Sequence, residues 1–243
     1  ADSLTNTPEM GVHGIIEFAN RTLTFVLAAL AVALLVMLWN LRKERKDIFW
    51  LTFGLLASIP AQAVIGGITV LSGLNPYVVS LHFLVSAALV AFSMLLVNRV
   101  FDRTGPTSPR NIARPAKPIR TLSIVAEIAT YLAVILGTLV TGAGPHSGDA
   151  TAPRIELNGY LVTRIHVVPV YLLVAVSLVL VVILWRRGKG DPLRTAVNLL
   201  FITVLYQGFI GYWQYFTGIP SQLVALHMLG ASLMLAAGTN VVD

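Results

Sequence analysis

The chain has 243 residues, of which 56% are hydrophobic and only 12% are charged, with a formal net charge of +6. Ordinary soluble domains carry about 25% charged residues, so this composition excludes a water-soluble globule, a disordered chain and a fibrous protein. The chain has no cysteine, which excludes thiolate metal sites and Cys-ligated iron–sulfur clusters within it. Its five histidines are therefore the main candidates for metal chemistry.

Seven apolar stretches are long enough to cross a bilayer, which requires about 20 residues. In chain order they are Ile15–Trp39, Phe49–Leu71, Pro76–Val97, Ile119–Val140, Tyr160–Trp185, Ala196–Phe216 and Pro220–Ala237. None of them has the alternating polarity of membrane barrel strands. The sequence predicts an all-α, polytopic membrane protein with seven transmembrane helices.

Lysine and arginine are concentrated in the loops that follow spans one, three and five. These loops hold 14 of the 17 basic residues: Arg42, Lys43, Arg45, Lys46, Arg99, Arg103, Arg110, Arg114, Lys117, Arg120, Arg186, Arg187, Lys189 and Arg194. Basic loops remain in the cytoplasm, so we expect the N-terminus of this chain outside the cell membrane and the C-terminus in the cytoplasm. The positive charge is thereby explained by orientation, and no nucleic-acid partner is expected.

An internal repeat connects the first three spans with the last three. Four residues, Gln62, Gly66, Gly73 and His82, recur 145 positions later as Gln207, Gly211, Gly218 and His227. Span four has no counterpart, because its equivalent would precede Ala1. The repeat predicts two similar four-helix halves, with the first helix of the first half missing. We expect an incomplete first half at residues 1–100, a basic cytoplasmic linker at 101–118 and a second half at 119–243.

The orientation places the candidate ligands at one depth, because Asn20, His82, His166 and His227 each lie about two turns or less from the outer end of a helix. His166 and His227 are expected on facing helices of the second half, where two imidazoles suit axial ligation of heme iron. Arg164 lies nearer the surface and is a candidate partner for heme propionates. A histidine can instead hydrogen-bond to a neighbouring helix, but ionisable residues within spans are costly and usually functional.

The first half differs from the second at one position. His82 matches His227, but Asn20 stands where the repeat expects a histidine. Because asparagine is a poor iron ligand, His82 alone would leave a coordination position open to substrate chemistry. Glu17 lies on the same helix face as Asn20 and is a candidate proton acceptor, or else an interfacial carboxylate paired with Arg21. His13 is an alternative ligand or a histidine on the solvent side.

Four further polar residues each have two possible roles. Glu127, towards the cytoplasmic end of span four, either carries protons or forms an interhelical hydrogen bond. His146, in an outer loop rich in turn-forming residues, either caps the second site or is exposed. We expect Gln62 and Gln207 to hold helices together rather than to contact a cofactor.

Together these residues resemble the heme A synthase family of bacterial type, without its first transmembrane helix. The resemblance covers essentially the whole chain. It rests on Glu17-Phe-Ala-Asn20-Arg21, on Gln62 through His82, on His166 and His227, and most distinctively on Val140-Thr-Gly-Ala-Gly-Pro-His146-Ser-Gly-Asp149. It implies eight spans in two four-helix halves and oxidation of the C8 methyl group of heme O to a formyl group, giving heme A for terminal oxidases.

The resemblance also implies the roles of individual residues. A heme b would lie between His166 and His227, the substrate heme O near His82, Asn20 and Arg21, and Glu17 would be essential to the oxidation. The family motif Glu-x-x-His-Arg has Asn20 in place of its histidine here. Implied partners are heme O synthase, a terminal oxidase under assembly and an electron acceptor that the sequence does not identify.

Two other functions compete with this one. A diheme b-type electron-transfer cytochrome that leaves heme unmodified would be expected to keep two histidines in each half, which disfavours it here. A transporter or heme-handling protein is disfavoured by the difference between the halves. Transfer of a prenyl group to heme would need Asp-rich motifs for Mg²⁺-diphosphate, and the sequence has none.

Overall fold

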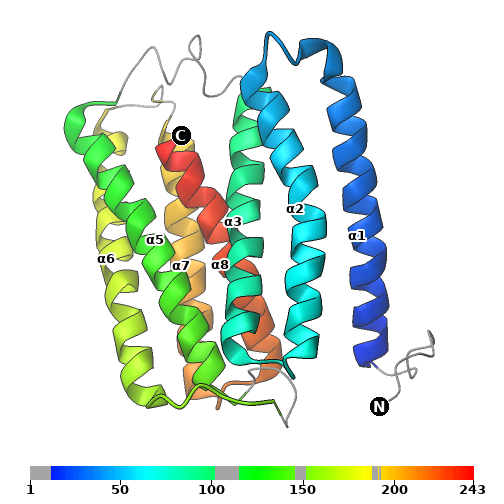
Figure 1. Ribbon diagram of the computed structural model, residues 1–243. Coiled ribbons are helices and arrows are strands. Elements are labelled where there is room, and N and C mark those ends of the chain that lie inside the picture. The colour runs from blue at the N-terminus through cyan, green and yellow to red at the C-terminus, as the bar shows by residue number, and fades with distance from the viewer. Residues whose placement is uncertain (1–11, 102–114, 146–151, 188–190, 192) are drawn as a thin grey trace. The chain divides into compact units, whose positions relative to one another are not determined.

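The structure is a computed structural model that describes residues 12–101, 115–145, 152–187, 191 and 193–243. These residues form seven long helices and no strand (Figure 1): α1 (Val12–Met37), α2 (Lys46–Leu71), α3 (Pro76–Val100), α5 (Lys117–Ala143), α6 (Gly159–Arg186), α7 (Leu193–Phe216) and α8 (Ser221–Val242). A short 3₁₀ helix, η1 (Trp39–Leu41), follows α1. All seven helices are long and apolar enough to cross a membrane, which confirms the predicted all-helical membrane fold.

The helices match the predicted spans, and the largest difference is at the end of the last one. The prediction ended this span at Ala237. In the structure α8 continues to Val242. Thr239 is buried there and donates a hydrogen bond to a neighbouring helix, so its polarity is satisfied inside the protein rather than at a helix end.

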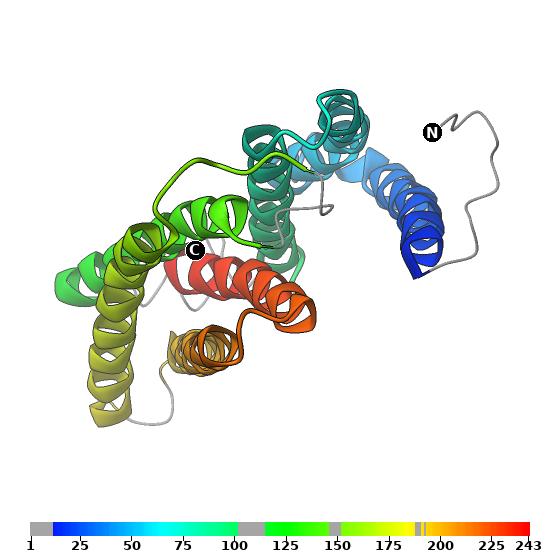
Figure 2. The same cartoon turned by 90° about the horizontal axis from the view of Figure 1, so that it is seen from below.

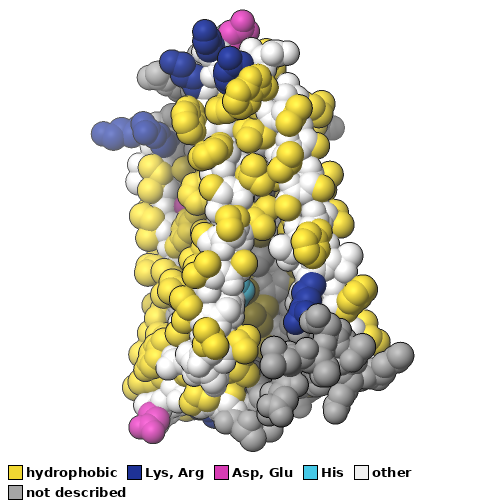
Figure 3. Space-filling model, turned by 45° about the vertical axis from the view of Figure 1, so that its right-hand side comes forward, with side chains coloured by type: hydrophobic (Ala, Val, Ile, Leu, Met, Phe, Trp, Pro, Cys, Tyr) yellow, Lys and Arg dark blue, Asp and Glu magenta, His cyan; other side chains and the backbone are white. Residues whose placement is uncertain are grey.

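The chain divides into two compact units, residues 1–61 and 62–243. In the first unit, Leu38 and Ile48 are buried around the connection between α1 and α2. Arg42 fastens this connection, since its Nη1 donates to the Trp39 carbonyl at 2.6 Å and its guanidinium lies 4.9 Å from the centre of the Trp39 ring. Lys and Arg side chains gather at this end, while hydrophobic side chains cover the flanks of the helices (Figure 3).

The second unit contains the hydrophobic core. Helices α6 and α8 each pack against both α5 and α7, so α6 and α8 form the diagonal pair of a four-helix arrangement (Figure 2). Leu173, Leu180 and Leu200 are fully buried within it. On α5, the small side chains of Ala126 and Ala129 are also almost fully buried, because small residues allow membrane helices to approach closely. Helix α3 joins this arrangement by packing on α5 and α8.

The turns before α3 and α8 have the same unusual backbone. Gly73 and Leu74 have φ values of +65° and +59°, and Gly218 and Ile219 have φ values of +77° and +59°. The amide of Leu74 donates to the Thr69 carbonyl at 3.0 Å, and that of Ile219 donates to the Gln214 carbonyl at 2.8 Å. A residue with a side chain is strained at positive φ. Both turns have two such positions in a row, which favours glycine at the first of them.

Three histidines lie at the same end of the second unit. His82, His166 and His227 are the seventh, eighth and seventh residues of α3, α6 and α8, and all three helices begin at the lower end in Figure 1. At 1.5 Å per residue this is about 10 Å from each helix start. The basic residues Arg99, Lys117 and Arg186 lie at the opposite helix ends. The expected common depth of the histidines is thus reproduced within this unit.

Candidate functional site

His166 on α6 is oriented by a backbone carbonyl. Its Nδ1 lies 2.9 Å from the carbonyl oxygen of Ala133 on α5. Since a carbonyl only accepts, Nδ1 carries the hydrogen and Nε2 keeps its lone pair for a ligand. The ring lies against Gly137, where a Cβ atom would be 3.3 Å from its Cε1. A side chain at position 137 would therefore push the imidazole out of this orientation.

His227 on α8 occupies the facing position. Its ring lies against Gly211 of α7, where a Cβ would be 3.4 Å from Cε1. Its Nδ1 is buried and has no hydrogen-bond partner among the described residues. His166 and His227 lie near the starts of α6 and α8, the diagonal pair of helices. Their pairing around one ligand stays a prediction.

His82 on α3 also lies against a glycine of the preceding helix. A Cβ at Gly66 of α2 would lie 3.5 Å from its Cε1 and 3.8 Å from its Nε2. Its Nδ1 is likewise buried without a partner in the described part of the chain. His82 and His227 therefore each lie against a glycine on the preceding helix and each have an Nδ1 without a partner among the described residues.

The glutamines of the repeat bind the histidine-bearing helices. Gln207 donates from Nε2 to the carbonyl oxygen of His227 at 2.8 Å. Gln62 donates from Nε2 to Oγ of Ser86 at 2.7 Å, and Ser86 donates in turn to the carbonyl oxygen of His82 at 2.9 Å. The expectation that these glutamines hold helices together is confirmed. Gln207 binds the histidine carbonyl directly, and Gln62 binds the hydroxyl that donates to the other histidine carbonyl.

The structure shows no contact between the remaining predicted site residues and the three histidines among the described residues. Arg164 is exposed, and its guanidinium lies 4.3 Å from the centre of the Tyr160 ring, so its contact with a propionate stays a prediction. Asn20 and Arg21 are exposed on α1 in the first unit, and their role at His82 stays a prediction too. Glu17 and His13 are in α1, but their side chains are outside the described residues, as is all of His146.

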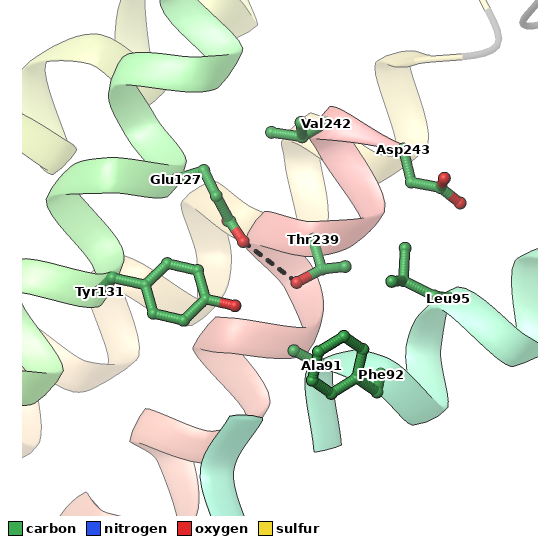
Figure 4. A pocket seen from close by; sticks show the side chains of 8 residues that line it. All are labelled: Ala91, Phe92, Leu95, Glu127, Tyr131, Thr239, Val242 and Asp243. Atoms are coloured by element: carbon green, nitrogen blue, oxygen red, sulfur yellow. Dashed lines mark hydrogen bonds between the residues drawn. The ribbon is translucent and has the colours of Figure 1, made fainter. Parts of the chain in front are cut away.

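Glu127 forms the interhelical hydrogen bond that is one of its two expected roles. Its Oε1 accepts from the hydroxyl of Thr239 on α8 at 3.1 Å (Figure 4). Its Oε2 is buried and has no hydrogen-bond partner within the described residues. The two residues border a cavity of about 310 Å³ between α3, α5 and α8, which Phe92 and Tyr131 also line. The carboxyl group rests on the bare backbone of Gly238, where a Cβ would collide with Oε2.

Replacement of Gly238 by alanine should therefore destabilise the protein. We expect the free energy of unfolding in mixed detergent–SDS micelles to fall by ~1–3 kcal/mol, as is usual for an overpacked contact. Gly208→Ala on α7 is the matched control, because a Cβ there meets nothing within 4 Å. Adding Glu127→Ala to Gly238→Ala removes the colliding oxygen and should recover part of the loss. Equal losses with and without the carboxyl group would contradict the assignment.

The three imidazoles fit a heme by the chemistry of their donors. His166 offers Nε2 opposite a fixed Nδ1–H, which is the usual arrangement of a metal-binding histidine. His82 and His227 have the same imidazole donors, but their Nδ1 atoms have no hydrogen-bond partner among the described residues, so His166 shows this orienting contact and the other two do not. Among the described residues no group of three or more His, Cys, Asp or Glu side chains could hold a metal ion. Two axial imidazoles around a heme iron do not require such a group.

The sequence did not identify several of these contacts. The Ala133 carbonyl is a backbone group and has no sequence signal. Ser86 is a polar residue within an apolar span, which is a usable signal, whereas Thr239 lies beyond the predicted end of the last span. Gly137 lies just before the most distinctive motif, and only its position against the His166 ring gives it a role.

Comparison with known proteins agrees with the resemblance. The model of a family of cytochrome oxidase assembly proteins, COX15-CtaA, matches residues 5–239. The heme A synthase of Listeria welshimeri is 26% identical over 241 residues, which cover 95% of this chain and 76% of the relative. That of Bacillus cereus is 23% identical, covering 93% and 75%, and that of Lysinibacillus sphaericus is 31% identical, covering 55% and 42%. No solved structure matches the chain.

Proposed function

Because this chain belongs to the COX15-CtaA family of cytochrome oxidase assembly proteins, we propose that it is a heme A synthase. The proposed reaction is oxidation of the C8 methyl group of heme O to a formyl group, which gives heme A for terminal oxidases. The relatives named heme A synthase support it over most of the chain. The observation that carries the proposal is that His82 and His227 each lie against a glycine of the preceding helix, while His166 lies at a matching position on α6, the helix diagonal to α8.

In this proposal His166 and His227 would hold a heme b in the second half. A heme supplies redox-active iron, and the chain supplies its orientation. The Ala133 carbonyl fixes the His166 ring and leaves Nε2 free of the hydrogen, and the Gln207 amide holds the turn that carries His227. Arg164, on the first two turns of α6, would neutralise a propionate at the polar boundary.

The first half receives the substrate heme O at His82, with Asn20 and Arg21 as further contacts. A single strong ligand suits a heme that must bind, react and leave. Glu17, one turn before Asn20 and Arg21, would accept the proton released as the methyl group is oxidised. Its family role supports this assignment, since the side chain is outside the described residues.

The proposed location is a bacterial cell membrane, with the N-terminus of this chain outside, the C-terminus in the cytoplasm and both heme sites in the outer leaflet. The segregation of Lys and Arg supports this orientation. We expect heme O synthase to supply the substrate, a terminal oxidase under assembly to receive the product, and an unidentified acceptor to take the electrons.

Co-expression with a heme O source tests the proposed activity. The complete protein should be produced in a host that lacks its own heme A synthase, and the extracted hemes identified by liquid chromatography and mass spectrometry. Appearance of heme A supports the proposal. A well-folded protein that carries heme b and leaves heme O unconverted would overturn it in favour of the electron-transfer cytochrome.

A further inference from the structure

We propose that Gln62 and Gln207 are positioning residues for the heme-binding histidines. We also propose that His227 is held more rigidly than His82. Gln207 holds the His227 carbonyl directly, whereas Gln62 holds the His82 carbonyl through the hydroxyl of Ser86. We call the single Gln207 hydrogen bond the direct link and the two bonds through Ser86 the relayed link. The direct link suits a heme that stays bound, and the relayed link suits a heme that is exchanged. This inference rests on the proposed function, which assigns the resident heme to His227 and the substrate heme to His82.

The direct link depends on a glycine. The Gln207 side chain is only 6% exposed and lies between α7 and α8. It reaches the His227 carbonyl because Gly230, three residues further along α8, has no side chain. A Cβ at Gly230 would be 2.6 Å from Oε1 and 2.8 Å from Cδ of Gln207. A larger residue at this position is therefore incompatible with the observed placement of the amide.

The first half has different residues at the two matching positions. With the repeat offset of 145, Val85 corresponds to Gly230, and Ser86 corresponds to Ala231. A branched side chain thus replaces the glycine, and a hydroxyl appears where the second half has a methyl group. The Gln62 amide stops at the Ser86 hydroxyl, 2.7 Å away, and this hydroxyl continues to the His82 carbonyl at 2.9 Å. The two substitutions together convert a one-bond link into a two-bond link.

The two links constrain their helices to different degrees. The carbonyl of a mid-helix residue already accepts the amide four residues later, so a further donor from a neighbouring helix fixes that turn in place. In the second half, this donor is the amide of a buried glutamine. In the first half, the added donor is a serine hydroxyl of the same helix. Movement of α3 relative to α2 would break the bond from Gln62 to Ser86, but the His82 carbonyl would keep both of its donors. We therefore expect His227 to be held more rigidly than His82.

Removal of the direct link should loosen the resident heme. In the complete protein, Gln207→Leu should speed transfer of heme b to an apomyoglobin acceptor about tenfold, since a buried hydrogen bond is lost and a carbonyl loses its second donor. The low-spin electron paramagnetic resonance signal of heme b should also broaden or shift. Ser93→Ala is the matched control. Ser93 makes a similar intrahelical bond at 2.8 Å to the carbonyl of Leu89, which is not a histidine.

Exchanging the residues between the halves tests the difference between the links. Gly230→Val with Ala231→Ser should give the second half the relayed link and speed heme b transfer, as Gln207→Leu does. Val85→Gly with Ser86→Ala should give the first half the direct link. It should raise several-fold the amount of heme O and heme A that copurifies, with an unchanged heme b spectrum. Ser86→Ala alone, a milder change, should lower the copurifying heme O.

Three results would overturn the inference. The first is heme b transfer at the wild-type rate in folded Gln207→Leu. The second is equal acceleration of heme b transfer by Gln62→Leu and Gln207→Leu. This result would show that both glutamines act only through general helix packing. The third is unchanged retention of heme O and heme A in both first-half variants. Heme b transfer can be measured whether or not heme A is formed. If the wild-type protein never converts heme O, the proposed function is refuted. Faster heme b loss in Gln207→Leu would still support the link in the second half.

Discussion

Replacement of His227 or His166 by alanine should remove heme b from the purified protein. Each imidazole is expected to supply one axial ligand, and loss of even an outer-shell partner costs about 10–100-fold in metal affinity. We therefore expect the heme b content per protein to fall at least ~tenfold, with loss of the low-spin absorption spectrum. The measurement is the pyridine hemochrome assay together with the reduced-minus-oxidised spectrum of protein purified in detergent.

The control for this prediction is Leu229→Ala, which removes an exposed apolar side chain from the same helix, α8. It should keep its heme and its spectrum. His166 gives a second comparison, because its Nδ1 is held by the Ala133 carbonyl. Replacement of Gly137 by leucine should displace its ring without removing it, and should change the spectrum from low spin towards high spin. A wild-type spectrum in either alanine variant would refute the ligand assignment.

Replacement of His82 by alanine should abolish heme A formation and leave heme b in place. His82 is the expected ligand of the substrate heme, whereas the second-half site has its own two histidines. In the co-expression assay, only heme O and heme b should be extracted from cells with this variant. Glu17→Ala should have a similar effect on the reaction, since removal of a positioned acid–base group costs roughly 100- to 10,000-fold in rate.

Adjacent glycines of α2 provide a matched pair for the same prediction. A leucine at Gly66 would occupy the space of the His82 ring, because a Cβ there is already 3.5 Å from its Cε1. A leucine at Gly67 would meet nothing within 4 Å of its Cβ. Gly66→Leu should therefore reproduce the defect of His82→Ala, and Gly67→Leu should keep wild-type activity. Equal activities of the two leucine variants would show that the ring position is not important.

Much of the candidate site could be predicted because depth in a membrane is a one-dimensional property. The length of each apolar run and the side of its basic flanks give the position of a residue along the membrane normal. His82, His166 and His227 could thus be assigned to one level from the order of spans and charges alone. The repeat added that His82 and His227 are equivalent, and the glycine of the preceding helix against which each lies agrees with this.

The partner of each side chain could not be predicted in the same way. A span that is apolar on all sides has no polar face to fix its rotation about its own axis, so the sequence does not indicate which neighbour a residue meets. The contact of His166 with the Ala133 carbonyl and the hydrogen bond between Thr239 and Glu127 both depend on that rotation. The link from Gln207 to the His227 carbonyl depends in addition on the close approach allowed at Gly230.

The sequence by itself therefore determined the class of the protein, its seven spans and the histidines available to a heme, since hydrophobic length and ligand chemistry are local properties. Only the tertiary structure decided which backbone carbonyls orient those histidines and how the two halves differ in holding them. The physical reason is that a hydrogen bond between helices requires two atoms within about 3 Å, and helix rotation and packing set that distance. The effect of having Val85-Ser86 in one half and Gly230-Ala231 in the other can be understood only from that packing.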